Sequence, residues 1–136
     1  MSPPSPPESS LPRLLVVADD LLLNQALRRV LSPHFQVSFA RTVSTTALLL
    51  SASEPVFDVI LCEMGLTDGQ ATELLPLLEP WRPRIAFFTG MSLHLPEVQQ
   101  LVNAGFPVWT KPLHLDDLLD QLGRLTPPDC PPAQAA

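Results

Sequence analysis

Two kinds of apolar segment alternate along this sequence, and that alternation limits the possible folds more than any other feature. Short runs rich in β-branched and aromatic residues are each followed by a longer, leucine-rich run whose apolar residues recur every three or four positions. The first pattern is typical of a buried β-strand and the second of an amphipathic helix. Repeated strand–helix units build a parallel sheet with helices on both faces, so the sequence predicts an α/β fold.

The pattern repeats five times, which predicts a (βα)5 domain with three layers, αβα, around a doubly wound five-stranded parallel sheet. The expected strands are Leu14–Ala18, Phe35–Ala40, Val56–Cys62, Ile85–Phe88 and Val108–Thr110. The expected helices are Leu23–Leu31, Thr45–Leu50, Gln70–Leu78, Pro96–Asn103 and Leu115–Leu122. A short polar turn, Gly65–Gly69, follows the third strand.

Proline is concentrated at the two ends of the chain. Residues 1–12 and 125–136 are proline-rich and lack apolar periodicity, so we expect both to be disordered tails. Residues 13–124 then form a single domain, which 136 residues with 46% hydrophobic content can support.

Composition argues against two classes of partner. The net charge of −6 disfavours nucleic acid, because affinity for a phosphate backbone depends on cationic contacts. The longest uncharged apolar stretch, residues 42–53, is too short and too rich in Ser and Thr to span a membrane. Cys62 lies on an expected strand and Cys130 in a tail, so no disulfide is expected. We therefore expect a cytoplasmic protein that binds neither nucleic acid nor a membrane.

Polar side chains follow the expected strands at the points where they end. In an open parallel sheet a ligand site forms at the carboxyl ends of the strands, where the strand order reverses. The residues placed there are Asp19, Asp20, Glu63, Thr89 and Lys111. The sequence thus predicts that three acids, one hydroxyl and one ammonium group converge at one edge of the sheet.

Four segments in this order, VVADDLLLNQALRRVL, DVILCEMGLTDG, IAFFTG and AGFPVWTKPLHLDDLL, resemble the receiver domain of response regulators in bacterial two-component phosphorelay signalling. The resemblance covers roughly residues 13–124 and implies a flavodoxin-like fold. In that family a carboxylate pair after the first strand binds Mg²⁺, an aspartate after the third strand accepts a phosphoryl group, and a hydroxyl and a lysine contact the phosphoryl oxygens. These are the hard oxygen ligands and charge-stabilising donors that phosphoryl transfer needs.

Carried over by position, the resemblance makes Asp19 the metal ligand, with Asp20 as a neighbouring acid, and makes Thr89 and Lys111 the residues that contact the phosphoryl group. Glu63 stands at the position of the phosphoacceptor aspartate. Its extra methylene adds about 1.5 Å of reach, which spoils the alignment of the nucleophile.

Three further departures accompany Glu63. Ala18 replaces the first acid of the metal pair, and Gly69 follows Glu63 by six positions, two fewer than is common in the family. Val108 stands where an aromatic residue usually moves on activation, and Trp109 is expected to face the opposite side of its strand. Together these differences indicate a degenerate receiver, or pseudo-receiver.

The resemblance leaves several hypotheses open. The first is a phosphorylation-independent interaction module that is not an enzyme, needs no cofactor, and binds a histidine kinase, another signalling protein or a second copy through its fourth helix, fifth strand and fifth helix. The alternative is a still-active phosphoacceptor that binds Mg²⁺ weakly. A third is a flavodoxin-like domain for another small ligand, although no phosphate-cradling glycine run follows the first strand.

Purely structural roles for the three acids also stay open. Glu63 is either an ordinary solvated loop acid or the partner of Lys111, held near where a phosphoryl group would sit. Asp19 and Asp20 are also candidates for the N-cap of the first helix.

Overall fold

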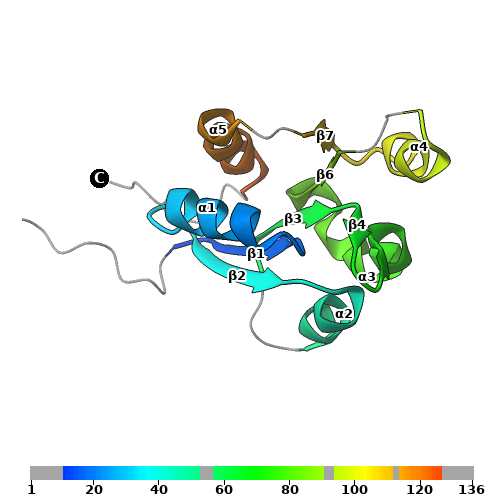
Figure 1. Cartoon of the computed structure of the whole chain (residues 1–136), viewed down its shortest axis with the longest axis horizontal. Coiled ribbons are helices and arrows are strands. Elements are labelled where there is room, and N and C mark those ends of the chain that lie inside the picture. Colours follow the sequence, from blue (N-terminus) through cyan, green and yellow to red (C-terminus); the bar gives the residue numbers. More distant parts are fainter. Residues whose placement is uncertain (1–10, 53–56, 91–93, 112–113, 127–136) are drawn as a thin grey trace, which may run out of the picture.

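The computed structural model describes residues 11–52, 57–90, 94–111 and 114–126. Its centre is the predicted five-stranded parallel sheet, with strand order β2–β1–β3–β6–β7 (Figure 1). The strands are β1 (Arg13–Val17), β2 (Gln36–Ala40), β3 (Val59–Glu63), β6 (Ile85–Thr89) and β7 (Val108–Thr110). This is the flavodoxin-like order, in which the chain reverses direction across the sheet between β1 and β3.

Helices cover both faces of the sheet, as predicted. They are α1 (Leu21–Leu31), α2 (Val43–Ser51), α3 (Leu75–Leu78), α4 (Pro96–Asn103) and α5 (Leu115–Leu125). Alternate side chains of the strands point into two apolar clusters, one shared with α1 and α5 and the other with α2, α3 and α4. Strands β3 and β6 are buried along their whole length, which explains their nearly continuous apolar sequences.

The segment after β3 differs from the prediction of one helix over Gln70–Leu78. A small antiparallel hairpin comes first, followed by a chain of short helical pieces in which only four residues are α-helical. The pieces are β4 (Gly65–Leu66), β5 (Gly69–Gln70), the 3-10 turn η2 (Ala71–Leu74), α3, and the 3-10 segment η3 (Glu79–Arg84). Three prolines lie between residues 76 and 83, and a proline cannot donate the backbone bond that a longer helix needs.

Other boundaries shift by a few residues. The third strand begins at Val59, while Val56, where it was expected to begin, lies outside the described residues. Helix α5 continues to Leu125, which the sequence had assigned to the tail. The rest of the predicted tails, apart from the described residues 11, 12 and 126, also lies outside the described residues. No helix in the described ranges is long and apolar enough to cross a membrane.

Candidate functional site

The strand ends bring the predicted site residues to one edge of the sheet. Glu63 is the last residue of β3 and Thr89 the last of β6, while Asp19 and Lys111 follow β1 and β7. The register holds them level, because Glu63 pairs with Phe88 and the backbone N–H of Lys111 donates to the Thr89 carbonyl at 2.8 Å. Strand pairing therefore places these residues side by side at one edge of the sheet.

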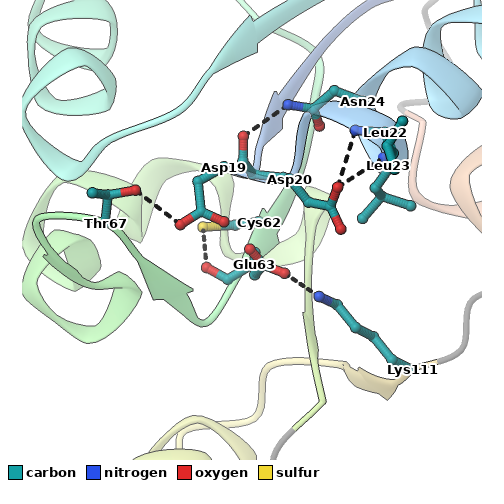
Figure 2. A network of polar contacts seen from close by, with 10 residues as sticks. Asp19, Asp20, Leu22, Leu23, Asn24, Cys62, Glu63, Thr67 and Lys111 are labelled. Atoms are coloured by element: carbon teal, nitrogen blue, oxygen red, sulfur yellow. Dashed lines mark hydrogen bonds and ion pairs between the residues drawn. The ribbon is translucent and has the colours of Figure 1, made fainter.

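Glu63 and Lys111 form an ion pair at this edge (Figure 2). The Lys111 ammonium donates to the Glu63 carboxylate, and its nitrogen lies 5.5 Å from the centre of the Phe88 ring. Glu63 is only 7% exposed, so its reading as a solvated loop acid is wrong. The predicted pairing of Glu63 with Lys111 is confirmed.

The pKa of the Glu63 carboxyl is raised above its ordinary value. Burial is the largest cause, because it disfavours the charged form. Lys111 opposes the shift through its hydrogen bond and its charge, while the neighbouring carboxylate of Asp19 adds to it. Glu63 therefore takes up a proton more readily than a solvated glutamate does.

The two acids after β1 have separate partners. Asp20 is the N-cap of α1 and accepts the backbone N–H groups of Leu22 and Leu23 at 3.0 and 3.1 Å. Asp19 instead accepts the hydroxyl of Thr67 at 3.0 Å (Figure 2). The N-cap role considered for both acids thus belongs to Asp20, whereas Asp19 faces Glu63 and the loop that follows it.

Thr67 is the site residue that sequence reasoning missed. It lies at the tip of the β4–β5 hairpin, within the expected polar turn. Its neighbour Asp68 points the other way and accepts the backbone N–H groups of Val43 and Ser44 at 2.6 and 3.1 Å. These bonds hold the pKa of the Asp68 carboxyl below its ordinary value, and the bond from the Val43 N–H is the largest cause. The shortened loop is therefore fixed on one side to the site and on the other to α2.

Apolar side chains close the site from below. Ala18, at the position of the missing acid, is fully buried, and its carbonyl accepts the side-chain amide of Asn24 at 2.9 Å. Cys62 is also fully buried, and burial, with a smaller contribution from Glu63, raises the pKa of its thiol. Cys62 is therefore a core residue, and its buried thiol is expected to be unreactive.

Thr89 and the β7 side chains are placed as their strand positions predict. Thr89 is almost wholly buried at the end of β6. Val108 packs against the cluster on the α4 side of the sheet, and Trp109 against the cluster on the α5 side. The expectation that Trp109 faces away from Val108 is confirmed.

Mg²⁺ prefers an octahedron of oxygen ligands, and several of the side-chain oxygens at this edge have other partners. Ala18 contributes no side-chain oxygen, one oxygen of Asp20 is used by the helix cap, and the Glu63 carboxylate faces an ammonium group. Within the described part of the chain, no group of three or more His, Cys, Asp or Glu side chains could hold a metal ion.

Comparison with known proteins relates this geometry to receiver domains. No protein-family model matches the sequence, and no curated protein does. The structure is similar to a CheY-like response regulator receiver domain protein from Methanospirillum hungatei JF-1, with 26% identity and a TM-score of 0.72 over 83% of this chain and 91% of that chain. It is similar to the non-phosphorylated HemR receiver domain from Leptospira biflexa, with 26% identity and a TM-score of 0.65 over 84% of this chain and 93% of that one.

A third similar structure is that of adenylate cyclase from Rhodopirellula baltica, with 25% identity and a TM-score of 0.68 over 85% of this chain and 87% of that one. The predicted flavodoxin-like fold is confirmed by these similarities. The chain thus resembles receiver domains of two-component response regulators in its structure as well as in its motifs.

Proposed function

We propose that this chain is a receiver-like signalling module that binds a protein partner without being phosphorylated. The observation that carries the proposal is the ion pair between Glu63 and Lys111. The lysine that would contact an incoming phosphoryl group is already paired with a carboxylate that is part of the chain. The site therefore holds a carboxylate against this lysine without any phosphoryl group.

Neither phosphoryl transfer nor a metal cofactor belongs to this proposal. A nucleophile must be aligned with the group that it attacks, whereas the Glu63 carboxylate is held against Lys111 and is one methylene longer than that of aspartate. The Asp19 carboxylate accepts the Thr67 hydroxyl, so this acid has a structural role in the site without a metal. The chain then acts by binding and not as an enzyme.

Glu63 imitates a phosphorylated residue only in part. A carboxylate brings one charge and two oxygens, against nearly two charges and three oxygens for a phosphoryl group. The Lys111 ammonium donates to one oxygen of the Glu63 carboxylate, so a carboxylate is enough to hold the lysine in position. The binding surface then stays in one conformation instead of alternating between two.

The surface that we propose for the partner is formed by α4, β7 and α5. Lys111 directly follows β7, so the ion pair fixes the end of that strand. Val102 on α4 is 43% exposed and is an apolar side chain that a partner can contact. The partner is a histidine kinase or another signalling protein, as the resemblance implies.

Intact-mass measurement after incubation with Mg²⁺ and a small acyl phosphate tests the absence of phosphorylation. We expect no phosphate adduct on the wild-type chain and none on Glu63→Gln. A receiver domain with the usual aspartate serves as the positive control for the reagent. A stoichiometric adduct on the wild-type chain that Glu63→Gln abolishes would instead establish the active phosphoacceptor.

Amide chemical shifts measured by NMR test the link between the ion pair and the binding surface. We expect Glu63→Gln to shift resonances of β7 and α4, because Lys111 loses its charged partner. Asp120→Asn is the control, since Asp120 and Arg124 are 70% and 76% exposed and pair with each other one turn apart on α5. If both variants leave β7 and α4 unchanged, the proposed role of the ion pair is lost.

A further inference from the structure

The basic residues of this acidic chain are unevenly distributed. Residues 21–53, which include α1, β2 and α2, hold three of its eight Lys and Arg residues and none of its fourteen Asp and Glu residues. Two of these three, Arg28 and Arg29, are neighbours in the last turn of α1. The end of α1 is therefore a small cationic area on a molecule whose net charge is −6.

The two arginines lie beside a hollow in the surface. The hollow has a volume of about 660 Å³, and the residues that line it are all exposed: Gln25, Arg28, Arg29, Ser32 and Pro33. The first four follow one another at helical spacing, so they form one polar stripe along the outer side of α1. All four can donate hydrogen bonds, and no carboxylate lies among them.

Both arginines are available to a ligand. Neither Arg28 nor Arg29 pairs with a carboxylate among the described residues, although three other cations of the chain do. The guanidinium group of Arg28 stacks on the ring of Phe39 in β2, with its carbon atom 4.9 Å from the ring centre. Stacking fixes the plane of a guanidinium group and leaves the N–H donors at its edge open. Arg28 can therefore receive a carboxylate in a fixed orientation, through two parallel hydrogen bonds.

The position of the arginines in α1 gives them a structural role as well. Cations in the last turn stabilise a helix, because they lie near its negative C-terminal end. That role requires neither the stacking of Arg28 on Phe39 nor the hollow. A binding role accounts for both features.

We propose that this hollow binds an acidic segment of a partner protein, with Arg28 and Arg29 each holding a carboxylate. Charge complementarity identifies the occupant. Acids outnumber bases in the rest of the chain, so an acidic segment is repelled elsewhere and attracted to this area. Two arginines match a short acidic segment, whereas affinity for nucleic acid requires many phosphate contacts.

This binding does not depend on the proposed function. Helix α1 begins at Leu21, beside the site, and ends at Leu31, about 15 Å further along its axis. Strand β2, which carries Phe39, lies at the opposite edge of the sheet from β7, as Figure 1 shows. Substitutions in the hollow leave the pair of Glu63 and Lys111 unchanged, so the two proposals can fail separately.

Fluorescence polarisation with a labelled peptide tests the proposal on the full chain. The probe is a fluorescein-labelled peptide with a short run of glutamates, and its counterpart has glutamines in their place. We expect the glutamate peptide to bind at least about 10-fold more tightly than the glutamine peptide, and its binding to weaken as salt is added. The proposal is overturned if the glutamate peptide does not bind, if both peptides bind equally, or if a labelled oligothymidine binds more tightly than the glutamate peptide.

Arg28→Gln and Arg29→Gln show whether the hollow is the binding site. Each removes one charge from an exposed side chain, and we expect each to weaken binding of the glutamate peptide by about 10-fold, the effect of one charged hydrogen-bonded pair. Arg41→Gln is the matched control, because Arg41 is exposed and lies beyond the other end of β2. It should change the affinity by less than about twofold, since salt screens a distant exposed charge. If Arg41→Gln weakens binding as much as the other two variants, only net charge matters and the proposal is wrong.

Amide chemical shifts locate the peptide without any substitution. We expect the glutamate peptide to shift resonances of residues 25–32 and of Phe39, and to leave those of α4 and β7 unchanged. Shifts confined to other surfaces of the chain contradict the proposed site.

Discussion

At the scale of single residues, Glu63 is held between two opposing influences. Burial raises the pKa of its carboxyl, and the Lys111 ammonium lowers it, with burial the larger of the two. The folded chain therefore binds a proton at Glu63 at pH values where the unfolded chain has released it. By linkage, this group lowers the free energy of unfolding as the pH rises from the ordinary value near 4.5 through the raised folded value.

Glu63→Gln should remove this pH dependence, because glutamine does not titrate. We expect the free energy of unfolding of the variant to change less between pH 4.5 and 7 than that of the wild-type chain. Chemical denaturation across this range, with both chains at one concentration, is the measurement. Identical pH profiles for the two chains would show that Glu63 has the same pKa in the folded and unfolded states.

Lys111→Met removes the cation and leaves the Glu63 carboxylate buried without its partner. The methionine keeps the apolar length of the side chain against Phe88, so the change acts mainly on charge. We expect a loss of about 1–3 kcal/mol at pH 7, the usual cost of an unsatisfied buried polar group. The double variant with Glu63→Gln should recover part of that loss. No recovery would mean that the two residues act independently.

The ion pair could be predicted from sequence because it depends on strand ends alone. Parallel strands bring their carboxyl ends to one edge of the sheet, so the proximity of Glu63 and Lys111 does not depend on the conformation of the loops. Thr67 could not be predicted in the same way. Its contact with Asp19 depends on the path of a short hairpin, and a run of Gly, Thr and Asp predicts a turn without giving its direction.

At the scale of elements, the link between the hairpin and α2 passes through Asp68. Asp68→Ala should lower the midpoint of unfolding at neutral pH, because two backbone N–H groups at the start of α2 lose their acceptor. The pKa of Asp68 is lowered on folding, so its contribution is present above the unfolded value of 3.8 and is lost as the pH falls through the folded value. The difference between the wild-type chain and Asp68→Ala should therefore shrink in acid.

Asp68→Asn separates the hydrogen bonds from the charge. Asparagine keeps one acceptor oxygen but does not titrate as a carboxyl, so this variant should lose less stability at neutral pH than Asp68→Ala. The difference in denaturant midpoint between Asp68→Asn and Asp68→Ala should stay the same at acidic pH. An Asp68→Asn chain as unstable as Asp68→Ala would show that the charge matters and the acceptor does not. Denaturant midpoints at neutral and acidic pH provide both comparisons.

Element types were predictable where one pattern continued for long enough. The buried strands and α1, α4 and α5 follow from apolar periodicity. The structure of residues 70–84 could not be predicted from apolar periodicity. The leucines there have helical spacing, but the prolines prevent a continuous helix. The competition produced η2, α3 and η3 in place of one helix.

At the scale of the whole molecule, both apolar clusters lie within one continuous part of the chain. Among the described residues the buried core begins at Leu14 and ends at Leu122, and Leu125, which the sequence had assigned to the tail, packs against the cluster on the α5 side. That residues 13–124 form the folded unit stays a prediction from the sequence.

A chain of residues 11–126 tests that prediction, because it keeps the whole described core. We expect its free energy of unfolding to match that of the full chain within about 0.5 kcal/mol, the scale of changes remote from packed groups. Urea denaturation with both chains at the same concentration is the measurement. A chain that ends at residue 111 is the control. It lacks the buried Leu118 and Leu122 of α5, each worth about 2–5 kcal/mol in a core, and should not unfold cooperatively. If the 11–126 chain is much less stable than the full chain, the terminal segments contribute to the fold and the domain boundaries are wrong.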